Sequence, residues 1–157
     1  PSVVEAAVDM GEVTVLPEPA NWALLACDSI RPVSHLAVGN PHSVVAVDEV
    51  AAVDLLSLGQ LVPQINLEII EAGPQPDAIT MRVHERGAGI TQACGTGACA
   101  AAWAAAQWGM VAGDLEEIVV HMPGGSAKVR LHQPATGRVT LVGPAKFVAT
   151  ISVESTL

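Results

Sequence analysis

The chain has 157 residues, a formal net charge of −9, and only seven Lys and Arg residues against 16 Asp and Glu. Half of its residues are hydrophobic, which is ample for a core, but only 3% are aromatic. An acidic surface repels a phosphate backbone and few rings are available to stack on bases, so the composition excludes nucleic-acid binding as a function.

The length suits one domain, or one half of a two-domain enzyme. Three cysteines, Cys27, Cys94 and Cys99, are too few and odd in number for a disulfide framework, so we expect a reducing cytoplasm. No apolar run reaches the length of a membrane span, and the first residues lack the basic stretch of a leader. The chain begins with Pro1 and not Met, so we expect a processed chain or a piece of a longer protein.

The first elements are predicted from β-branched residues and turn signals. Residues 2–8 and 13–16 indicate two strands around a turn at Met10-Gly11. Residues 22–27 form an apolar run of ambiguous type, within which Cys27 is interpreted as a small buried hydrophobic residue. Two further β-like runs flank Gly39-Asn40-Pro41-His42, whose Gly, Asn and Pro favour a turn.

His42 starts the second of these strands beside the turn. Its sequence context fits an incidental turn histidine and a functional one equally well. Residues 48–61 carry apolar side chains at nearly helical spacing, which predicts a short amphipathic helix capped by Asp48.

Two strands are predicted at 66–71 and 78–85. The alternation of side chains along the second puts Arg82, His84 and Arg86 on one face and Glu85 on the other. Glu85-Arg86 fits a solvated surface pair. The glycines at 87 and 89, which allow a sharp turn, instead favour a pair placed for a purpose.

The most informative stretch follows that turn. Cys94 stands directly before Gly95-Thr96-Gly97, and no helix breaker occurs from Ala98 to Trp108. Because this helix is small or apolar nearly all round, we expect it to be buried. Unpaired amides and the dipole at its start favour a thiolate, so we expect the pKa of Cys94 to be lowered.

The last third predicts strands only. Runs at 116–121 and 127–131 flank a hairpin turn, and runs at 137–142 and 146–153 flank Gly143-Pro144. His121 and His132 are interpreted as structural or exposed. About eight strands and one buried helix predict a mixed α+β domain in which a mostly antiparallel sheet wraps the helix.

The residues around Cys94 leave three chemistries open. The thiol could be a nucleophile paired with His42 or His84, a redox centre, or a base that removes a carbon-bound proton. Redox chemistry is disfavoured because Cys94 and Cys99 are five residues apart instead of three, and Cys99 is interpreted as a buried core thiol. We also find no metal-ligand spacing.

The stretch from Glu85 to Ala102, with its Cys-Gly-Thr-Gly, closely resembles the C-terminal cysteine signature of diaminopimelate epimerases. Four more segments resemble that family in the same order and at similar spacings. They are Gly39-Asn-Pro-His, Asn66-Leu-Glu, His121-Met-Pro-Gly-Gly and Gly143-Pro-Ala. The resemblance covers essentially all 157 residues.

The resemblance implies an enzyme of two similar domains with its site between them, without pyridoxal phosphate or metal. Residues 1–157 would be the C-terminal domain, and the N-terminal domain, which carries the second cysteine, would be absent. The full enzyme would interconvert LL- and meso-diaminopimelate in bacterial lysine biosynthesis. The isolated domain would be inactive and prone to self-association, for example as a homodimer.

The resemblance also implies roles for particular residues. Cys94 would be one of two proton carriers, with His42 and Glu85 supporting it. Backbone amides at the helix start would bind the substrate α-carboxylate, and polar side chains would hold its other groups. The implied substrate-binding residues are Asn40, Asn66, Glu85, Arg86, Gly95 and Thr96. Ile90 departs from the family, which usually has Glu there, and this removes a polar contact.

Two other functions remain alternatives. Proline racemases and phenazine-type isomerases share the wider fold, although Asn66, Glu85 and Arg86 favour diaminopimelate with its second amino-acid centre. A non-catalytic module that binds a carboxylate at the helix start is the alternative outside enzymes.

Overall fold

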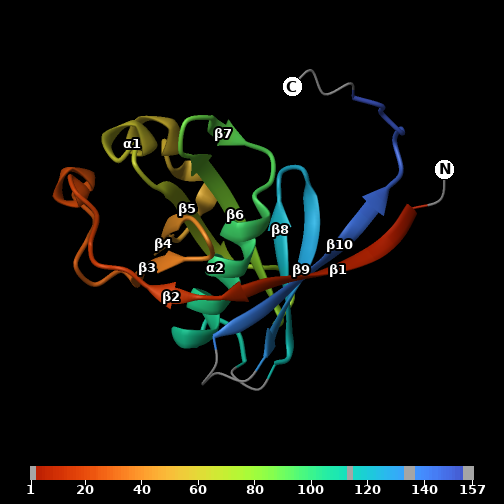
Figure 1. The fold of residues 1–157 in the computed structure, drawn as a ribbon. Helices are drawn as coiled ribbons and strands as arrows, with labels where there is room; N and C mark the ends of the chain where they lie inside the picture. The colour runs from red at the N-terminus through yellow and green to blue at the C-terminus, as the bar shows by residue number, and fades with distance from the viewer. Residues whose placement is uncertain (1–2, 113–114, 133–136, 154–157) are drawn as a thin grey trace.

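The computed structural model describes residues 3–112, 115–132 and 137–153. In these residues ten strands form one sheet in the order β1-β10-β9-β8-β6-β5-β4-β3-β2, with β7 paired to β6 (Figure 1). Most neighbouring pairs are antiparallel, whereas β4–β5 and β6–β8 are parallel. The strands are β1 (Val3–Glu12), β2 (Thr14–Val15), β3 (Val33–Ala37), β4 (Pro41–Ala46), β5 (Asn66–Ala72), β6 (Ala78–Glu85), β7 (Gly89–Thr91), β8 (Glu117–Met122), β9 (Gly125–His132) and β10 (Arg138–Lys146).

The sheet curls because its two ends are joined by the chain. β1 and β2 lie at opposite ends of the strand order, yet only Val13 separates them in sequence. Val13 N–H donates to the Gly137 carbonyl at 2.9 Å, which holds this junction against the start of β10. The sheet therefore wraps into a half-barrel, with β1 and β2 continuing in one line across its open side (Figure 1).

Helix α2 (Gly95–Gln107) fills the inside of the curl (Figure 1). Six alanines from Ala98 to Ala105 have no exposed surface, and strands β3–β6 and β8–β10 pack around the helix. Alanine combines high helix propensity with a small side chain, so the sheet can approach the helix from several sides. The predicted α+β class, a sheet wrapped round one buried helix, is confirmed.

The outer face of the sheet carries a second, smaller core. A 3-10 helix, η1 (Trp22–Leu25), and helix α1 (Leu55–Leu61) pack there against Val45, Leu67 and Ile69. The parallel β4–β5 pair requires a crossover, and α1 lies in it.

The helix predicted at 48–61 is wrong in its first half. Residues 50–52 form a 3-10 turn, η2 (Val50–Ala52), and α1 is capped by Asp54, whose carboxylate accepts the Ser57 N–H at 3.2 Å. The Arg82 guanidinium donates hydrogen bonds to the carbonyls of Val50 and Val53. These carbonyls are therefore engaged by a side chain instead of by the backbone N–H groups of an α-helix. The predicted cap, Asp48, instead pairs with Arg31.

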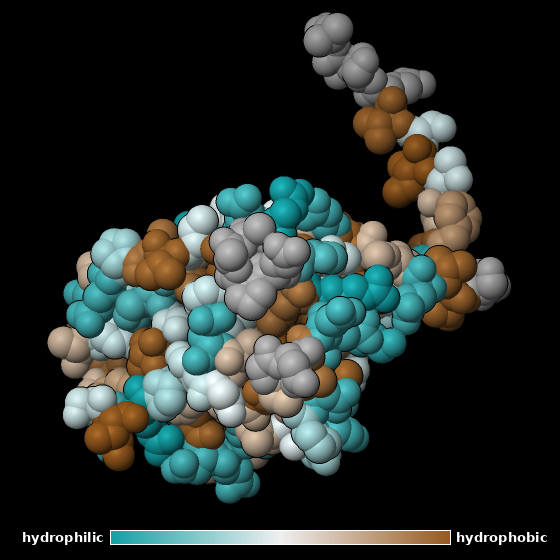
Figure 2. Space-filling view, turned by 90° about the horizontal axis from the view of Figure 1, so that it is seen from below, coloured by the Kyte–Doolittle hydropathy of each residue, from teal (hydrophilic) through white to brown (hydrophobic). Residues whose placement is uncertain are grey.

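The strand predicted at 146–153 is also wrong. β10 runs through Gly143-Pro144 to Lys146, and residues 147–153 carry no strand. Beyond Val142 β10 pairs only with β1, so Pro144, which has no N–H, sits where one edge of the strand is free. Phe147, Val148, Ile151 and Val153 are 68–89% exposed, and the segment 147–153 projects away from the body (Figure 2).

Candidate active site

Cys94 is the N-cap of α2, as its position before Gly95 predicts. Its Sγ accepts the Gly97 N–H at 3.3 Å and lies 3.5 Å from the Thr96 hydroxyl. Only 7% of the residue is exposed. The thiol is thus held at the N-terminus of the buried helix, where the Gly95 and Thr96 amides have no partner within the helix.

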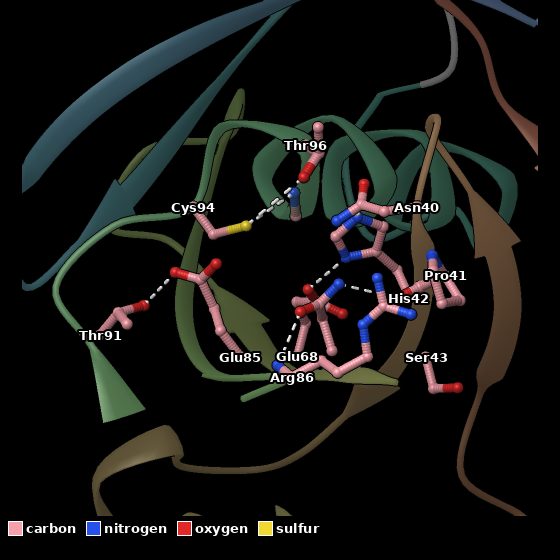
Figure 3. Close-up of polar contacts among 12 residues, drawn as sticks. Asn40, Pro41, His42, Ser43, Glu68, Glu85, Arg86, Thr91, Cys94 and Thr96 are labelled. Atoms are coloured by element: carbon pink, nitrogen blue, oxygen red, sulfur yellow. Dashed lines mark hydrogen bonds and ion pairs between the residues drawn. The ribbon is translucent and has the colours of Figure 1, made fainter. Parts of the chain in front are cut away.

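The pKa of Cys94 is raised, which contradicts the expectation of a lowered value. Burial is the largest cause, and the negative charges of Glu68 and Glu85 add to it. The hydrogen bonds from Thr96 and Gly97 act in the opposite direction but do not outweigh burial. Figure 3 shows both acids below the thiol, at the open end of α2. The sequence around Cys94 could not predict this effect, because Glu68 lies on β5 and Glu85 on β6.

Asn40 enters the site from the turn before β4, and His42 from the second residue of that strand. Gly39 has a φ of +76°, which lets the chain reverse between β3 and β4. His42 is 1% exposed, and both ring nitrogens are engaged: Nδ1 lies 2.6 Å from Glu68 Oε1 and Nε2 lies 2.9 Å from Asn40 Oδ1. The ring is therefore fixed in the interior, unlike an incidental turn histidine.

Glu68 is the site residue that sequence reasoning missed. The parallel register sets His42 opposite Asn66, so that Glu68, two residues on, lies on the same face. Glu68 has no exposed surface, and burial raises the pKa of its carboxyl. An acid inside the apolar run of β5 was the available signal, since buried carboxylates need a partner.

Asn66 connects two segments of the site. Its Nδ2 donates to the Pro41 carbonyl at 2.8 Å, and its Oδ1 accepts the Arg86 N–H at 2.9 Å. Asn66 is 3% exposed, and in this structure both ends of its amide bond to the chain. It therefore ties the start of β4, which carries His42, to the end of β6.

Glu85 and Arg86 diverge at the end of β6, as the strand alternation predicts. Glu85 accepts a hydrogen bond from Thr91 on β7 and faces Cys94 (Figure 3). Arg86 is exposed at the rim. His84 points to the outer face, where its ring packs against Gly59 of α1, so it is removed from the list of partners for Cys94.

The other two cysteines lie away from this cluster. Cys99 is fully buried in α2, and burial raises its pKa to about 12. Cys27 packs half-buried in the outer core, and all three cysteines are free. Cys94 is consequently the sole thiol of this chain at the start of α2.

Residues 3–112, 115–132 and 137–153 contain no group of three or more His, Cys, Asp and Glu side chains placed to hold a metal. Within the same residues, no helix is long and apolar enough to cross a membrane. A cavity of about 520 Å³ lies on the outer face beside Cys27 and the Arg31–Asp48 pair, remote from Cys94.

The chain matches the family model described as diaminopimelate epimerase over residues 35–148. Curated relatives with that name include one from Cyanothece sp., 45% identical over 74% of this chain and 42% of its own length. Another, from Oceanobacillus iheyensis, is 35% identical over 88% of this chain and 48% of its own. The chain therefore spans about half the length of the curated relatives it matches.

Solved structures match the fold. A predicted epimerase from Pseudomonas aeruginosa covers 93% of this chain and 59% of its own, with a TM-score of 0.62 and 18% identity. A phenazine biosynthesis protein from Bacillus anthracis covers 88% of this chain and 39% of its own, with a TM-score of 0.52 and 14% identity. At these sequence identities the structural similarity supports the half-barrel fold and says nothing about the reaction.

Proposed function

Since this chain belongs to the diaminopimelate epimerase family, we propose that it supplies one half of the active site of an amino-acid epimerase acting on diaminopimelate. The observation that carries the proposal is Cys94 at the start of α2, flanked by Glu85 and Glu68. The family name gives the substrate, and the geometry suits a proton transfer at a carbon next to a carboxylate.

The substrate carboxylate would bind at the Gly95 and Thr96 amides. Removing the α-hydrogen moves negative charge onto that carboxylate, and amides fixed at the positive end of a helix stabilise this charge without reorganising. Asn40 and Arg86 would hold polar groups of the substrate, with Arg86 suited to a carboxylate by its forked geometry. Asn66 would act by holding both segments in register.

Cys94 would carry the proton on one face of the α-carbon. A base on the opposite face takes the α-hydrogen, Cys94 gives its thiol proton to the carbanion, and the configuration is inverted. The raised pKa of Cys94 supports the thiol as the resting form, which is the form that donates. In the reverse direction the Cys94 thiolate removes the proton.

None of the three cysteines of this chain would be the opposing base. Cys99 and Cys27 are both packed elsewhere, so a second domain or subunit would face Cys94. The 157-residue chain alone is then expected to show no epimerisation of diaminopimelate. Turnover by the chain alone, measured by chiral separation of the LL and meso forms, would contradict this part of the proposal. A cytoplasmic enzyme of lysine biosynthesis is part of the same proposal.

The role of Cys94 is tested in an enzyme that holds this chain together with the opposing domain. Cys94→Ser should lower interconversion by about 10²–10⁴-fold, because a serine hydroxyl is a far weaker acid than a thiol. Exchange of the α-hydrogen in deuterated water measures the same step. Cys27→Ser, a matched change in the outer core, should leave the rate unaltered. Normal turnover in Cys94→Ser would refute the role, and turnover of proline with none of diaminopimelate would favour a racemase.

A further inference from the structure

Glu68 is buried beneath the site, and one of its two carboxylate oxygens lacks a hydrogen-bond partner in the part of the chain that the structure describes. Its Oε1 lies 2.6 Å from His42 Nδ1, whereas Oε2 has no hydrogen-bond partner among the described residues. Neither side chain of the pair has any exposed surface. Burying a carboxylate oxygen without a hydrogen-bond partner costs folding free energy. We therefore expect Glu68 to do something that an apolar residue in its place could not do.

The distances fix where the protons lie. At 2.6 Å a proton must stand between Glu68 Oε1 and His42 Nδ1, because two facing lone pairs would repel. At 2.9 Å from Asn40 Oδ1, Nε2 must carry a second proton. A neutral imidazole that donates Nδ1–H to a carboxylate would leave a bare Nε2 facing the Asn40 carbonyl, and two acceptors would then repel. The two states that fit the contact, imidazolium with carboxylate and imidazole with carboxylic acid, both carry Nε2–H. Burial, which raises the pKa of Glu68, favours sharing of the first proton.

The Nε2 proton and the orientation of Asn40 depend on each other. Nε2–H occupies the Asn40 carbonyl, so the NH₂ end of that amide is turned away from the ring. Asn40 is half-buried and comes from the turn above His42, at the end of the site where α2 begins (Figure 3). A substrate carboxylate bound there needs donors, and a flipped amide would offer it an acceptor instead.

Glu68 also touches the first turn of α2. A Cβ placed on Gly97 would lie 2.7 Å from Glu68 Oε1 and 3.1 Å from Cys94 Sγ, so the carboxylate and the thiol flank the same glycine. Besides His42, the titratable groups that act on Glu68 or Cys94 here are Glu85 and the two groups themselves.

We propose that Glu68 is a positioning residue: through His42 it locks Asn40 with its NH₂ group as the donor presented to a substrate carboxylate at the start of α2. The relay itself rests on geometry alone. Its use toward a carboxylate rests on the proposed function.

The relay is tested on the 157-residue chain by ¹⁵N NMR of its histidine rings. His42 is assigned by the signal lost in His42→Gln. In the unchanged chain, His42 Nε2 should resonate as a protonated nitrogen. Glu68→Gln should move Nε2 toward the unprotonated position, because a neutral amide can face either ring tautomer. Glu71→Gln, the same change on the opposite face of β5, should leave it in place. An unprotonated Nε2 in the unchanged chain, or no shift in Glu68→Gln, would overturn the relay.

The use of the relay is tested by turnover in the two-domain enzyme. Glu68→Gln should raise KM for diaminopimelate about tenfold with a smaller change in kcat, because a contact made to both the bound and the reacting carboxylate is lost from binding. Glu71→Gln should alter neither. An unchanged KM with the NMR shift present would refute the substrate role, while failure of Cys94→Ser to lower turnover would refute the proposed function and leave the NMR result standing.

Discussion

Each of the three thiols has a pKa set by where its side chain is buried. Cys94 has two hydrogen bonds at a helix start, yet its pKa is raised because burial and two nearby acids act more strongly. Cys99, inside the same helix, has no compensating hydrogen bond and reaches about 12. Burial also raises the pKa of Cys27 in the outer core. At the residue scale, desolvation of the thiolate therefore dominates over local helix geometry.

This balance predicts a loss of stability in alkali. Above pH 9 the unfolded chain releases the Cys99 proton while the folded chain keeps it up to about 12, so the folded state binds more protons and stability falls as pH rises. The slope from Cys99 is up to about 1.4 kcal/mol per pH unit. Urea unfolding between pH 8 and 10.5 measures it. Cys99→Ala should flatten the dependence, and an identical slope in that variant would contradict the assignment.

Helix α2 is defined at both ends by short-range signals and in the middle by its alanines. Its start is the Cys94 cap. Its end is Gly109, with a φ of +69°, where Gly109 N–H donates to Ala106 and Met110 N–H to Ala105. This is the paired bonding of a Schellman motif, which satisfies the last carbonyls. The element is locally complete, and the sheet adds burial around it.

The first turn of α2 predicts a contrast between two glycines. Gly97→Ala would force a methyl group against the Glu68 carboxylate and Cys94, and should cost about 1–3 kcal/mol despite the better helix propensity of alanine. Gly95→Ala would meet only the end of the Leu141 side chain, which can rotate, and should cost less than about 1 kcal/mol. Thermal unfolding of both variants compares them. Equal stability of the two would contradict the crowding between Glu68 and Cys94.

The whole molecule combines the half-barrel around α2 with an arm, which consists of the outer parts of β1 and β10 and the segment 147–153. Chain continuity at Val13 draws the two sheet ends together around α2, while the outer parts of β1 and β10 extend as a two-stranded ribbon (Figure 1). β1 is exposed over most of its length, including Val3, Val4 and Val8, and the apolar residues after β10 are exposed too. Apolar surface of this extent is unusual on a monomer and favours self-association.

The arm predicts association that can be separated from folding. Val148 and Ile151 are 89% and 81% exposed, so replacing both by Lys should alter stability by less than about 0.5 kcal/mol. The same change should shift concentrated protein toward monomer in analytical ultracentrifugation. Val15→Lys with Leu24→Lys adds equal charge on the body and should leave association unaltered. Association that falls equally in both variants would point to net charge instead of the arm.

The sequence determined the features that depend on neighbours along the chain. The cap at Cys94, the length of α2, the hairpin between β8 and β9 and the alternation of β6 all follow from residues within a few positions of one another. Turn chemistry, strand alternation and helix propensity act at that range, so each could be predicted. The ordered motifs also indicated the family.

Only the tertiary structure decided which side chains share an environment. The parallel β4–β5 register brings His42 to Glu68, 26 positions away in the sequence. Arg82, on the distant strand β6, donates to the carbonyls of Val50 and Val53 and so prevents an α-helix there. The raised pKa of Cys94 has the same origin, because the acids and the burial that cause it come from elements far apart in the chain. Electrostatic and desolvation energies depend on distance in space, and that distance is set by the fold.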